Sequence, residues 1–372
     1  MNLPSLVRRA LLLMFVGALW AAQAAPWSTD RAAFWYGETT WPVGCNFTPS
    51  TAINQLEMWQ ADTFDPTTIS RELRWAHGLG FNAVRVFLHN LAFEQDPEGF
   101  LKRVDQFLRL ADKNQIKVMF VLFDSCWNPF PKVGRQPDPV PGIHNSGWVQ
   151  CPGLEVLGDA TRHDDLAPYV KTVTRRFKND SRVLAWDLFN EPDNMNRPSY
   201  VAAEPADKPD LALALLKKAF AWARECEPSQ PLTAGVWVGP WGDPEKLSAV
   251  EKVSLTESDV VSFHNYGWPD DIRVCVQNLK RYKRPILCTE YMARPAGSSF
   301  DPILRYLKQE KVGAMNWGFV SGKTQTVYPW DSWEKPYASE PEVWFHDIIR
   351  SDGTAFNAVE VDYIKRVTKR RL

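Results

Sequence analysis

Two glutamates in this sequence each stand at the end of a short apolar run that is typical of a buried strand. Glu191 directly follows residues 183–190, and Glu290 lies near the end of residues 286–291. Two carboxyl groups held roughly 5–5.5 Å apart can cleave a glycosidic bond with retention, because one protonates the leaving oxygen while the other attacks the anomeric carbon. The pair therefore predicts a retaining glycosidase. For Glu191 by itself, the alternative interpretation is a polar strand end that leads into a helix.

The elements that must position these two side chains alternate along the chain. Short apolar runs with little polar alternation indicate parallel strands that are covered on both faces. Eight such runs occur, at residues 41–47, 82–88, 117–124, 183–190, 232–238, 260–266, 286–291 and 314–320. Segments with apolar residues at helical spacing separate them, at residues 69–79, 97–114, 164–177, 206–226, 271–282 and 301–309, and the connection 239–257 shows the weakest helical pattern.

Strands and helices that alternate eight times predict an α/β fold with a single closed (β/α)8 TIM barrel. An open doubly wound sheet would usually carry a glycine-rich phosphate-binding turn after its first strand, and this sequence has none. The loops after strands 3 and 8, residues 125–163 and 321–340, are long. Because barrel enzymes gather catalytic groups at the C-terminal ends of their strands, we expect these loops to shape a substrate cleft.

The composition favours a neutral substrate. Lys and Arg together number 43 against 44 for Asp and Glu, a formal net charge of −1. The overall charge therefore gives no attraction to nucleic acid. The chain has 17 Trp, whose flat faces suit the apolar faces of sugar rings, although core packing is the alternative for any single one. We therefore expect a carbohydrate partner, no nucleic-acid partner, and a monomer.

The first 24 residues have the pattern of a secretory signal peptide. Arg8 and Arg9 precede an apolar run over residues 10–20, and Ala22 and Ala24 supply small residues for a cleavage before Ala25. A run of about 11 residues is shorter than the roughly 20 that a membrane-spanning helix needs, so an uncleaved anchor is the lesser alternative. We expect a secreted or periplasmic protein, without a membrane partner after cleavage, whose catalytic domain covers residues 25–372.

Six cysteines in an exported protein allow fifteen disulfide pairings. Cys126 and Cys151 enclose a proline-rich loop and form the preferred pair, whereas Cys45 and Cys288 lie within predicted strands and are expected to be buried thiols. No spacing of cysteines and histidines matches a zinc site. We therefore expect neither a metal nor a cofactor.

The residues around the two glutamates resemble those of glycoside hydrolase clan A and, within it, the cellulase-type enzymes of family 5. Asn190, Glu191 and Pro192 match the acid/base signature of that family, and Glu290 matches its nucleophile. The resemblance implies that Glu191 is the acid/base and that Asn190 binds the 2-hydroxyl of the substrate. It also implies a retaining mechanism on neutral β-linked glycans of the β-1,4-glucan, xylan or mannan type, or on their oligosaccharides.

Four more positions match the family at the ends of other strands. The resemblance implies that Arg85 supports the nucleophile, that Tyr266 of the pair His264 and Tyr266 donates a hydrogen bond to it, and that Trp317 is the platform under the attacked sugar. Arg85 and the Tyr266 hydroxyl are expected to lower the pKa of the nucleophile. Structural roles are the alternatives, as a buried ion-pair partner for Arg85, a core histidine for His264 and a core ring for Trp317.

The third strand departs from the family pattern. It ends in Asp124, Ser125 and Cys126, where family 5 enzymes commonly show Asp-x-His. Asp124 is expected to support the substrate site, with a loop cap as the alternative.

The loop after the eighth strand carries further candidates for sugar binding. Lys323 and Gln325 have long polar side chains that suit sugar hydroxyls, and Trp330 and Trp333 are expected to frame a further subsite. An ordinary surface loop is the alternative for all four residues.

Two other functions compete with the glycosidase. A catalytically silent carbohydrate-binding barrel would keep its tryptophans but would usually lose a glutamate or the supporting arginine, and all three residues are present here. A metal-dependent polysaccharide deacetylase would need clustered His and Asp ligands, which the histidine spacings disfavour. The kind of β-glycan, and endo or exo action, depend on the shape that the long loops adopt.

Overall fold

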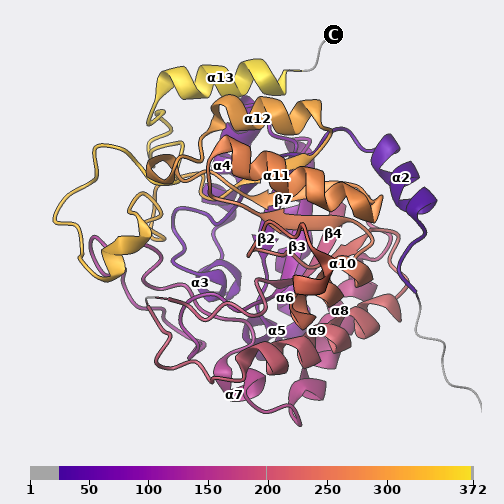
Figure 1. The fold of residues 1–372 in the computed structure, drawn as a ribbon. Helices are drawn as coiled ribbons and strands as arrows, with labels where there is room; N and C mark the ends of the chain where they lie inside the picture. The colour runs from indigo at the N-terminus through magenta and orange to yellow at the C-terminus, as the bar shows by residue number, and fades with distance from the viewer. Residues whose placement is uncertain (1–24, 198, 370–372) are drawn as a thin grey trace, which may run out of the picture.

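The computed structural model describes residues 25–197 and 199–369, and the predicted signal peptide, residues 1–24, lies outside the described residues. Eight parallel strands form the centre of the fold and helices surround them (Figure 1). The prediction of a (β/α)8 TIM barrel is confirmed. The strands are β1 (Val43–Asn46), β2 (Ala83–Phe87), β3 (Lys117–Asp124), β4 (Val183–Asn190), β5 (Leu232–Thr233), β6 (Val261–His264), β7 (Ile286–Glu290) and β8 (Gly313–Asn316).

The barrel closes between β5 and β6 through a short contact. The hydrogen-bonded strand order is β5-β4-β3-β2-β1-β8-β7-β6. Val236, beyond the end of β5, forms a parallel bridge with Phe263 of β6, and its amide donates to the Ser262 carbonyl at 3.1 Å. The fifth strand is therefore shorter than the predicted run 232–238, but the ring of strands is complete.

The helices lie outside the strands, and their N-termini carry clear sequence signals. Asp65 caps α4 by accepting from the amides of Thr67 and Thr68, with Pro66 at the first helical position. Ser248 and Glu251 form a capping box at α10, the helix within 239–257. The α-helices are α2 (Thr29–Glu38), α3 (Gln55–Trp59), α4 (Pro66–Gly78), α5 (Asn90–Gln95), α6 (Pro97–Lys113), α7 (Leu154–Leu157), α8 (Ala167–Phe177), α9 (Lys208–Arg224), α10 (Ala249–Glu257), α11 (Pro269–Leu279), α12 (Phe300–Gln309) and α13 (Ala358–Thr368).

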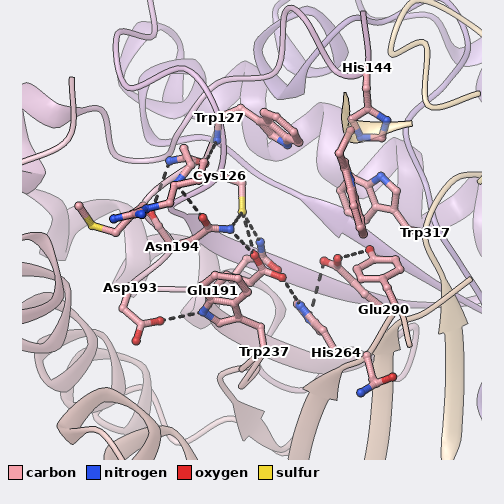
Figure 2. A pocket seen from close by; sticks show the side chains of 17 residues that line it. Cys126, Trp127, His144, Glu191, Asp193, Asn194, Trp237, His264, Glu290 and Trp317 are labelled. Carbon is pink, nitrogen blue, oxygen red and sulfur yellow. Dashed lines mark hydrogen bonds and ion pairs between the residues drawn. The ribbon is translucent and has the colours of Figure 1, made fainter. Parts of the chain in front are cut away.

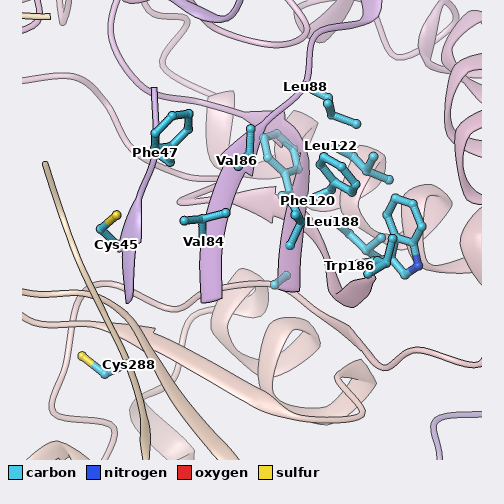
Figure 3. Close-up of a cluster of buried hydrophobic side chains, with 14 of the residues drawn as sticks. Cys45, Phe47, Val84, Val86, Leu88, Phe120, Leu122, Trp186, Leu188 and Cys288 are labelled. Atoms are coloured by element: carbon cyan, nitrogen blue, oxygen red, sulfur yellow. The ribbon is translucent and has the colours of Figure 1, made fainter. Parts of the chain in front are cut away.

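Side chains of β2 alternate between the two sides of the barrel wall. Val84 and Val86 pack in the layer between strands and helices (Figure 3), whereas Ala83 and Phe87 belong to separate clusters inside the barrel. Arg85, at the inward position between Ala83 and Phe87, is completely buried. Because side chains of a strand alternate between its two faces, the guanidinium of Arg85 lies in the barrel interior.

The N-terminal end of the barrel is covered by α2. Trp35 and Tyr36 of this helix pack against the apolar cluster at that end, and the Tyr36 hydroxyl donates to the Lys311 carbonyl at 2.6 Å. Since this end is closed, the open mouth lies at the C-terminal ends of the strands. The long loops after β3 and β8 leave from the same mouth.

The predicted disulfide between Cys126 and Cys151 is wrong, because both residues are free thiols. The Cys151 thiol bonds with the side chain of Asn90 and the carbonyl of Leu122, both at 3.3 Å. The Cys126 thiol instead faces Glu191 at the mouth. The backbone therefore aims the two sulfur atoms at different surroundings, although the loop brings both residues to the end of β3. Cys45 and Cys288 are buried free thiols, as expected.

No helix in the described part of the chain is long and apolar enough to cross a membrane.

Gly44 of β1 lies against β2 so closely that no side chain fits there. A Cβ at this position would overlap the carbonyl oxygen of Ala83. We expect Gly44→Ala to destabilise the protein by about 1–3 kcal/mol or more, because the ladder between β1 and β2 must shift. The measurement is the free energy of unfolding in denaturant.

Gly37→Ala is the matched control for Gly44→Ala. Gly37 lies in α2, and no atom lies within 4 Å of the place that a Cβ on this residue would take. This change should be neutral, or stabilising by up to about 1 kcal/mol. Equal stability of the two variants would contradict the tight β1–β2 approach.

Candidate active site

The two glutamates predicted as a pair meet at the mouth of the barrel. Glu191 follows β4 and Glu290 ends β7, and both side chains are buried. One oxygen of each carboxyl group and one ring nitrogen of His264 lie within 4.8 Å of one another. All three residues line a cavity of about 510 Å³ (Figure 2). The fold thus joins residues that are 99 positions apart, 290 − 191, into one polar cluster.

Glu290 is held by two donors. Arg85 donates from Nη1 to Oε1 at 2.8 Å, and the Tyr266 hydroxyl donates to Oε2 at 2.6 Å. Each carboxylate oxygen therefore has its own partner, and the plane of the group is fixed. Both contacts were expected from the sequence.

Arg85 also organises the floor of the cavity. Its Nε and Nη2 donate to Oδ2 of Asp187 at 3.0 and 2.7 Å, its Nη1 donates to Asn46, and its Nη2 donates to Asn190 at 2.6 Å. Hydrogen bonds between ionised partners are short and strong, and the planar guanidinium fixes their directions. One fully buried cation therefore sets the positions of four acceptors, including Glu290.

Glu191 is held on the opposite side of the cavity. Its Oε1 lies 2.7 Å from Nδ1 of His264, and its Oε2 accepts from Asn194 at 2.6 Å and from the Cys126 thiol at 3.3 Å. Glu191 has a φ of +42°, a left-handed conformation that costs a non-glycine residue of the order of 1 kcal/mol or more. This turn directs the side chain into the cavity as the chain leaves β4.

Burial raises the pKa of both Glu191 and Glu290. The expectation of a lowered pKa for Glu290 is therefore wrong, because Arg85 and Tyr266 oppose the effect of burial without outweighing it. Burial lowers the pKa of His264 to about 4, so its ring is neutral near neutral pH. A guanidinium contacts Glu290 directly, whereas the hydrogen-bond partners of Glu191 are neutral.

Asp124 lies beneath the cavity and does not line it. Its Oδ1 accepts from the amide of Asn190 at 2.9 Å, and its Oδ2 accepts from the indole of Trp148 at 2.7 Å. Burial raises the pKa of Asp124 to about 6. With Arg85 on its carbonyl oxygen and Asp124 on its amide nitrogen, Asn190 is held in one orientation.

Tryptophans form the apolar walls. Trp127, Trp237, Trp317 and Trp330 all line the cavity, which places two of the predicted rings, Trp317 and Trp330, at the site. Trp333 does not line it and instead stacks on Trp127, with ring centres 5.6 Å apart and planes inclined by 15°.

The prediction that Lys323 and Gln325 bind sugar hydroxyls is wrong. Neither residue lines the cavity. The Lys323 ammonium pairs with Glu57 at 2.5 Å, and the Gln325 amide donates to the carbonyls of Val140 and Ile143 at 2.7 and 3.0 Å. Both side chains are used to tie loops together, because the chain after Trp317 turns away from the mouth towards β1.

A metal ion could also be held by part of this cluster. Glu191, His264 and Glu290 are the group of three acidic or imidazole side chains in the described residues that lies close enough to share one ion. The same atoms bond with one another and with Arg85 and Tyr266, so their present geometry serves hydrogen bonding.

The family model for cellulase (glycosyl hydrolase family 5) matches residues 44–322, which include both glutamates and every strand except the first residue of β1. The chain belongs to glycosyl hydrolase family 5. It is a glycosidase, as the resemblance of its strand ends implies. A search of curated proteins found no match for this hydrolase.

Solved structures of other glycosidases share the fold of this family 5 hydrolase. An exo-β-1,4-mannosidase from Opitutaceae bacterium strain TAV5 is 19% identical, with a TM-score of 0.57, and the match covers 88% of this chain and 58% of that one. The chain thus spans less than two thirds of that mannosidase. A β-mannanase from the blue mussel Mytilus edulis is 14% identical, with a TM-score of 0.55 and coverage of 89% and 92%.

A third structure comes from a different glycan class. A xyloglucan-specific endo-β-1,4-glucanase from a metagenomic library is 15% identical, with a TM-score of 0.54, and the match covers 91% of this chain and 99% of that one. At these identities the likeness shows the fold alone.

Several residues of the site were missed at the level of sequence. Asp187 could have been found from the sequence. It lies in the middle of the apolar run of β4, and an acidic side chain within a buried strand needs a buried partner. Asn194 and Asp193 follow Glu191 in an irregular segment without a pattern. Trp237, whose indole donates to Asp193 at 2.8 Å, could not be told apart from the other tryptophans.

The amide of Asn194 stabilises the ionised form of Glu191. Its removal in Asn194→Ala should raise the pKa of Glu191 further, because a donor to the carboxylate is lost while burial stays. Carbon-13 NMR of the carboxyl groups, with Glu191→Gln to identify the signal, measures this shift.

Asn265→Ala is the control, because Asn265 lines the same cavity and its amide bonds with Cys275 rather than with Glu191. In Asn265→Ala the pKa of Glu191 should equal that of the wild type. An unchanged midpoint in Asn194→Ala would contradict the assigned hydrogen bond.

Proposed function

We propose that this family 5 hydrolase is a retaining β-glycosidase that acts on neutral β-linked glycans, with Glu191 as acid/base and Glu290 as nucleophile. The observation that carries the proposal is the approach of the two carboxyl groups to within 4.8 Å across the cavity. This distance is close to the roughly 5–5.5 Å of retaining enzymes and well below the 6.5–9.5 Å of inverting ones.

The partners of the two groups support their different roles. The nucleophile must be ionised, and Arg85 and Tyr266 stabilise the charge on Glu290. The acid must begin protonated, and burial favours the neutral form of Glu191. When Glu290 becomes esterified by the sugar, its negative charge disappears, the pKa of Glu191 falls, and the carboxylate can accept a proton from water.

Asn190 and Trp317 are proposed to hold the sugar that is attacked. Asn190 is fixed by Arg85 and Asp124, and its second amide hydrogen points to the Cys126 sulfur at 3.4 Å, a weak acceptor that the 2-hydroxyl can replace without reorienting the side chain. Trp317 lines the cavity beside Glu290 and offers its flat face to the apolar side of the ring.

We favour β-1,4-linked mannosides as substrates, followed by β-1,4-glucans. The support comes from the similar structures, which include a β-1,4-mannosidase, a β-mannanase and a β-1,4-glucanase. A catalytically silent barrel is disfavoured, since both glutamates and Arg85 are present, Arg85 donates to Glu290, and Glu191 contacts His264 in the same cavity.

We also propose that the protein is exported through residues 1–24 and acts as a monomer outside the cytoplasm. The support is the charged and apolar pattern of these residues. N-terminal sequencing of the protein recovered from the periplasm or medium should begin at Ala25.

Replacing each glutamate separates the two roles. Glu290→Ala should abolish turnover of all substrates. Glu191→Ala should lose roughly 10²–10⁴-fold on oligosaccharides but should still be glycosylated by aryl glycosides with very good leaving groups, which need no proton. Steady-state and burst kinetics on both substrate types measure the difference.

Added azide gives the independent check. In Glu191→Ala it should yield a glycosyl azide that keeps the substrate configuration, because it attacks the glycosyl-enzyme, whereas in Glu290→Ala any product should be inverted. An inverted azide from Glu191→Ala would reverse the assigned roles. Wild-type product with inverted configuration, seen by NMR, would rule out the retaining mechanism.

A further inference from the structure

Two long loops are joined to each other at the barrel mouth. Loop 3 (residues 125–153) and loop 8 (residues 317–357) share backbone hydrogen bonds from Asn145 to Thr324 at 2.9 Å and from Tyr337 to Gly142 at 3.1 Å. Gln325 adds the side-chain bonds described above. In Figure 1 loop 8 extends away from α13 towards the segments after β1 and β3. The two loops therefore form one continuous wall.

This wall also covers the segment that follows β1. From loop 8, the Lys323 amide donates to the Ser50 carbonyl at 3.0 Å. From loop 3, the Gly147 carbonyl accepts from the side chain of Asn54 at 2.8 Å, and a Cβ on Gly147 would collide with the side chain of Ile53. These contacts, of which those of Ile53, Asn54 and Gly147 are buried, pack the wall directly against the segment after β1.

The short helix η5 (Trp330–Trp333) spans the mouth at the edge of the wall. At one end the Trp330 ring meets Tyr266, which follows β6, edge-on at 5.1 Å. At the other end Trp333 stacks on Trp127, which follows β3. His144 of loop 3 lies beside η5 and donates from its amide to the Ser332 hydroxyl at 2.9 Å.

The strand order shows which part of the mouth η5 separates. From β3 to β6 the ring passes through β4 and β5 on one side and through β2, β1, β8 and β7 on the other. A bridge from β3 to β6 therefore leaves the β4–β5 side open. It closes the region above β1 and β2.

Behind Trp317 there is no room for another sugar. Its ring packs edge-on against Phe87 at 5.7 Å and Trp148 at 5.9 Å. The space beyond it is about 20 Å³, against about 510 Å³ for the catalytic cavity. The volume of the catalytic cavity is in the range of ligand-binding pockets.

Glu191 marks the direction in which the leaving group departs. An acid must contact the oxygen between the attacked sugar and its leaving group, so the leaving group lies on the Glu191 side. Figure 2 shows Asp193 and Asn194 on that side of Glu191, with Trp317, Glu290 and His144 on the other. Trp237, fixed by Asp193, is placed to support the leaving sugar.

We propose that the enzyme is exo-acting and removes single sugars from the non-reducing ends of β-linked oligosaccharides. In a β-1,4-linked chain the preceding sugar is attached at O4, opposite the anomeric carbon, and this end of the attacked ring faces the wall of loops 3 and 8. Only a terminal sugar fits there. This inference rests on the proposed function, since it uses the assigned role of Glu191.

The test uses the full-length mature protein and reducing-end-labelled β-1,4-mannotetraose and cellotetraose. The first products should be the free monosaccharide and the labelled trisaccharide. A tetraose methylated at its terminal O4 should react about 10–200-fold more slowly, the discrimination that one misplaced methyl group causes in a closed pocket. Early release of labelled monosaccharide or disaccharide, or equal rates for the capped tetraose, would overturn exo action.

Aryl β-mannosides and β-glucosides distinguish this failure from that of the proposed function. Their hydrolysis together with internal cleavage of the tetraoses overturns the exo inference alone. No turnover of aryl glycosides and oligosaccharides overturns the proposed function, and the exo inference with it.

Trp333→Ala tests the wall itself. Loss of the stack on Trp127 should loosen η5 and raise the relative rate on the capped tetraose by about tenfold. Phe34→Ala, which removes an exposed ring from α2 far from the mouth, should leave the ratio of capped to uncapped rates unchanged. An unchanged ratio in soluble, folded Trp333→Ala would contradict the role assigned to η5.

Discussion

A single buried guanidinium holds the active site together. Arg85 lies inside the barrel without solvent contact and bonds with Asp187, Asn46, Asn190 and Glu290. Breaking a buried ion pair by removing one partner typically costs about 3–5 kcal/mol, because the remaining charge has no water to stabilise it. The floor of the cavity is therefore strongly constrained, and the orientation of Asn190 and Glu290 follows from it.

The charge balance around Arg85 also explains how two neighbouring carboxyl groups differ. Burial disfavours ionisation of both, but only Glu290 contacts the guanidinium and a phenol hydroxyl. Glu191 contacts a neutral imidazole, an amide and a thiol. Two side chains of the same type therefore have different electrostatic surroundings in one cavity.

Cys126 also contributes to this asymmetry. Burial holds the pKa of its thiol well above the ordinary value, so it is a neutral, weak donor to Glu191. The family commonly has histidine at this position, which could carry a positive charge. Since Asn194 supplies the shorter hydrogen bond, at 2.6 Å, the carboxyl group keeps a strong donor without an added charge.

The sequence by itself determined the barrel and the group of polar side chains at its mouth. Strand-like runs separated by helical spacing specify a (β/α)8 ring, and residues at strand ends must meet at one mouth whatever the loops do. Glu191, Glu290, Arg85, His264 and Tyr266 could therefore be placed together before any contact was known.

Only the tertiary structure decided what the loops do. Lys323 and Gln325 have the chemistry of sugar ligands, yet they bond with Glu57 and with loop 3 carbonyls. Cys126 and Cys151 are close in sequence, but their thiols point apart into different surroundings. Loop conformation follows from contacts between distant segments rather than from a periodic pattern, so neither the closed wall nor the direction of the open side could be read from the residues alone.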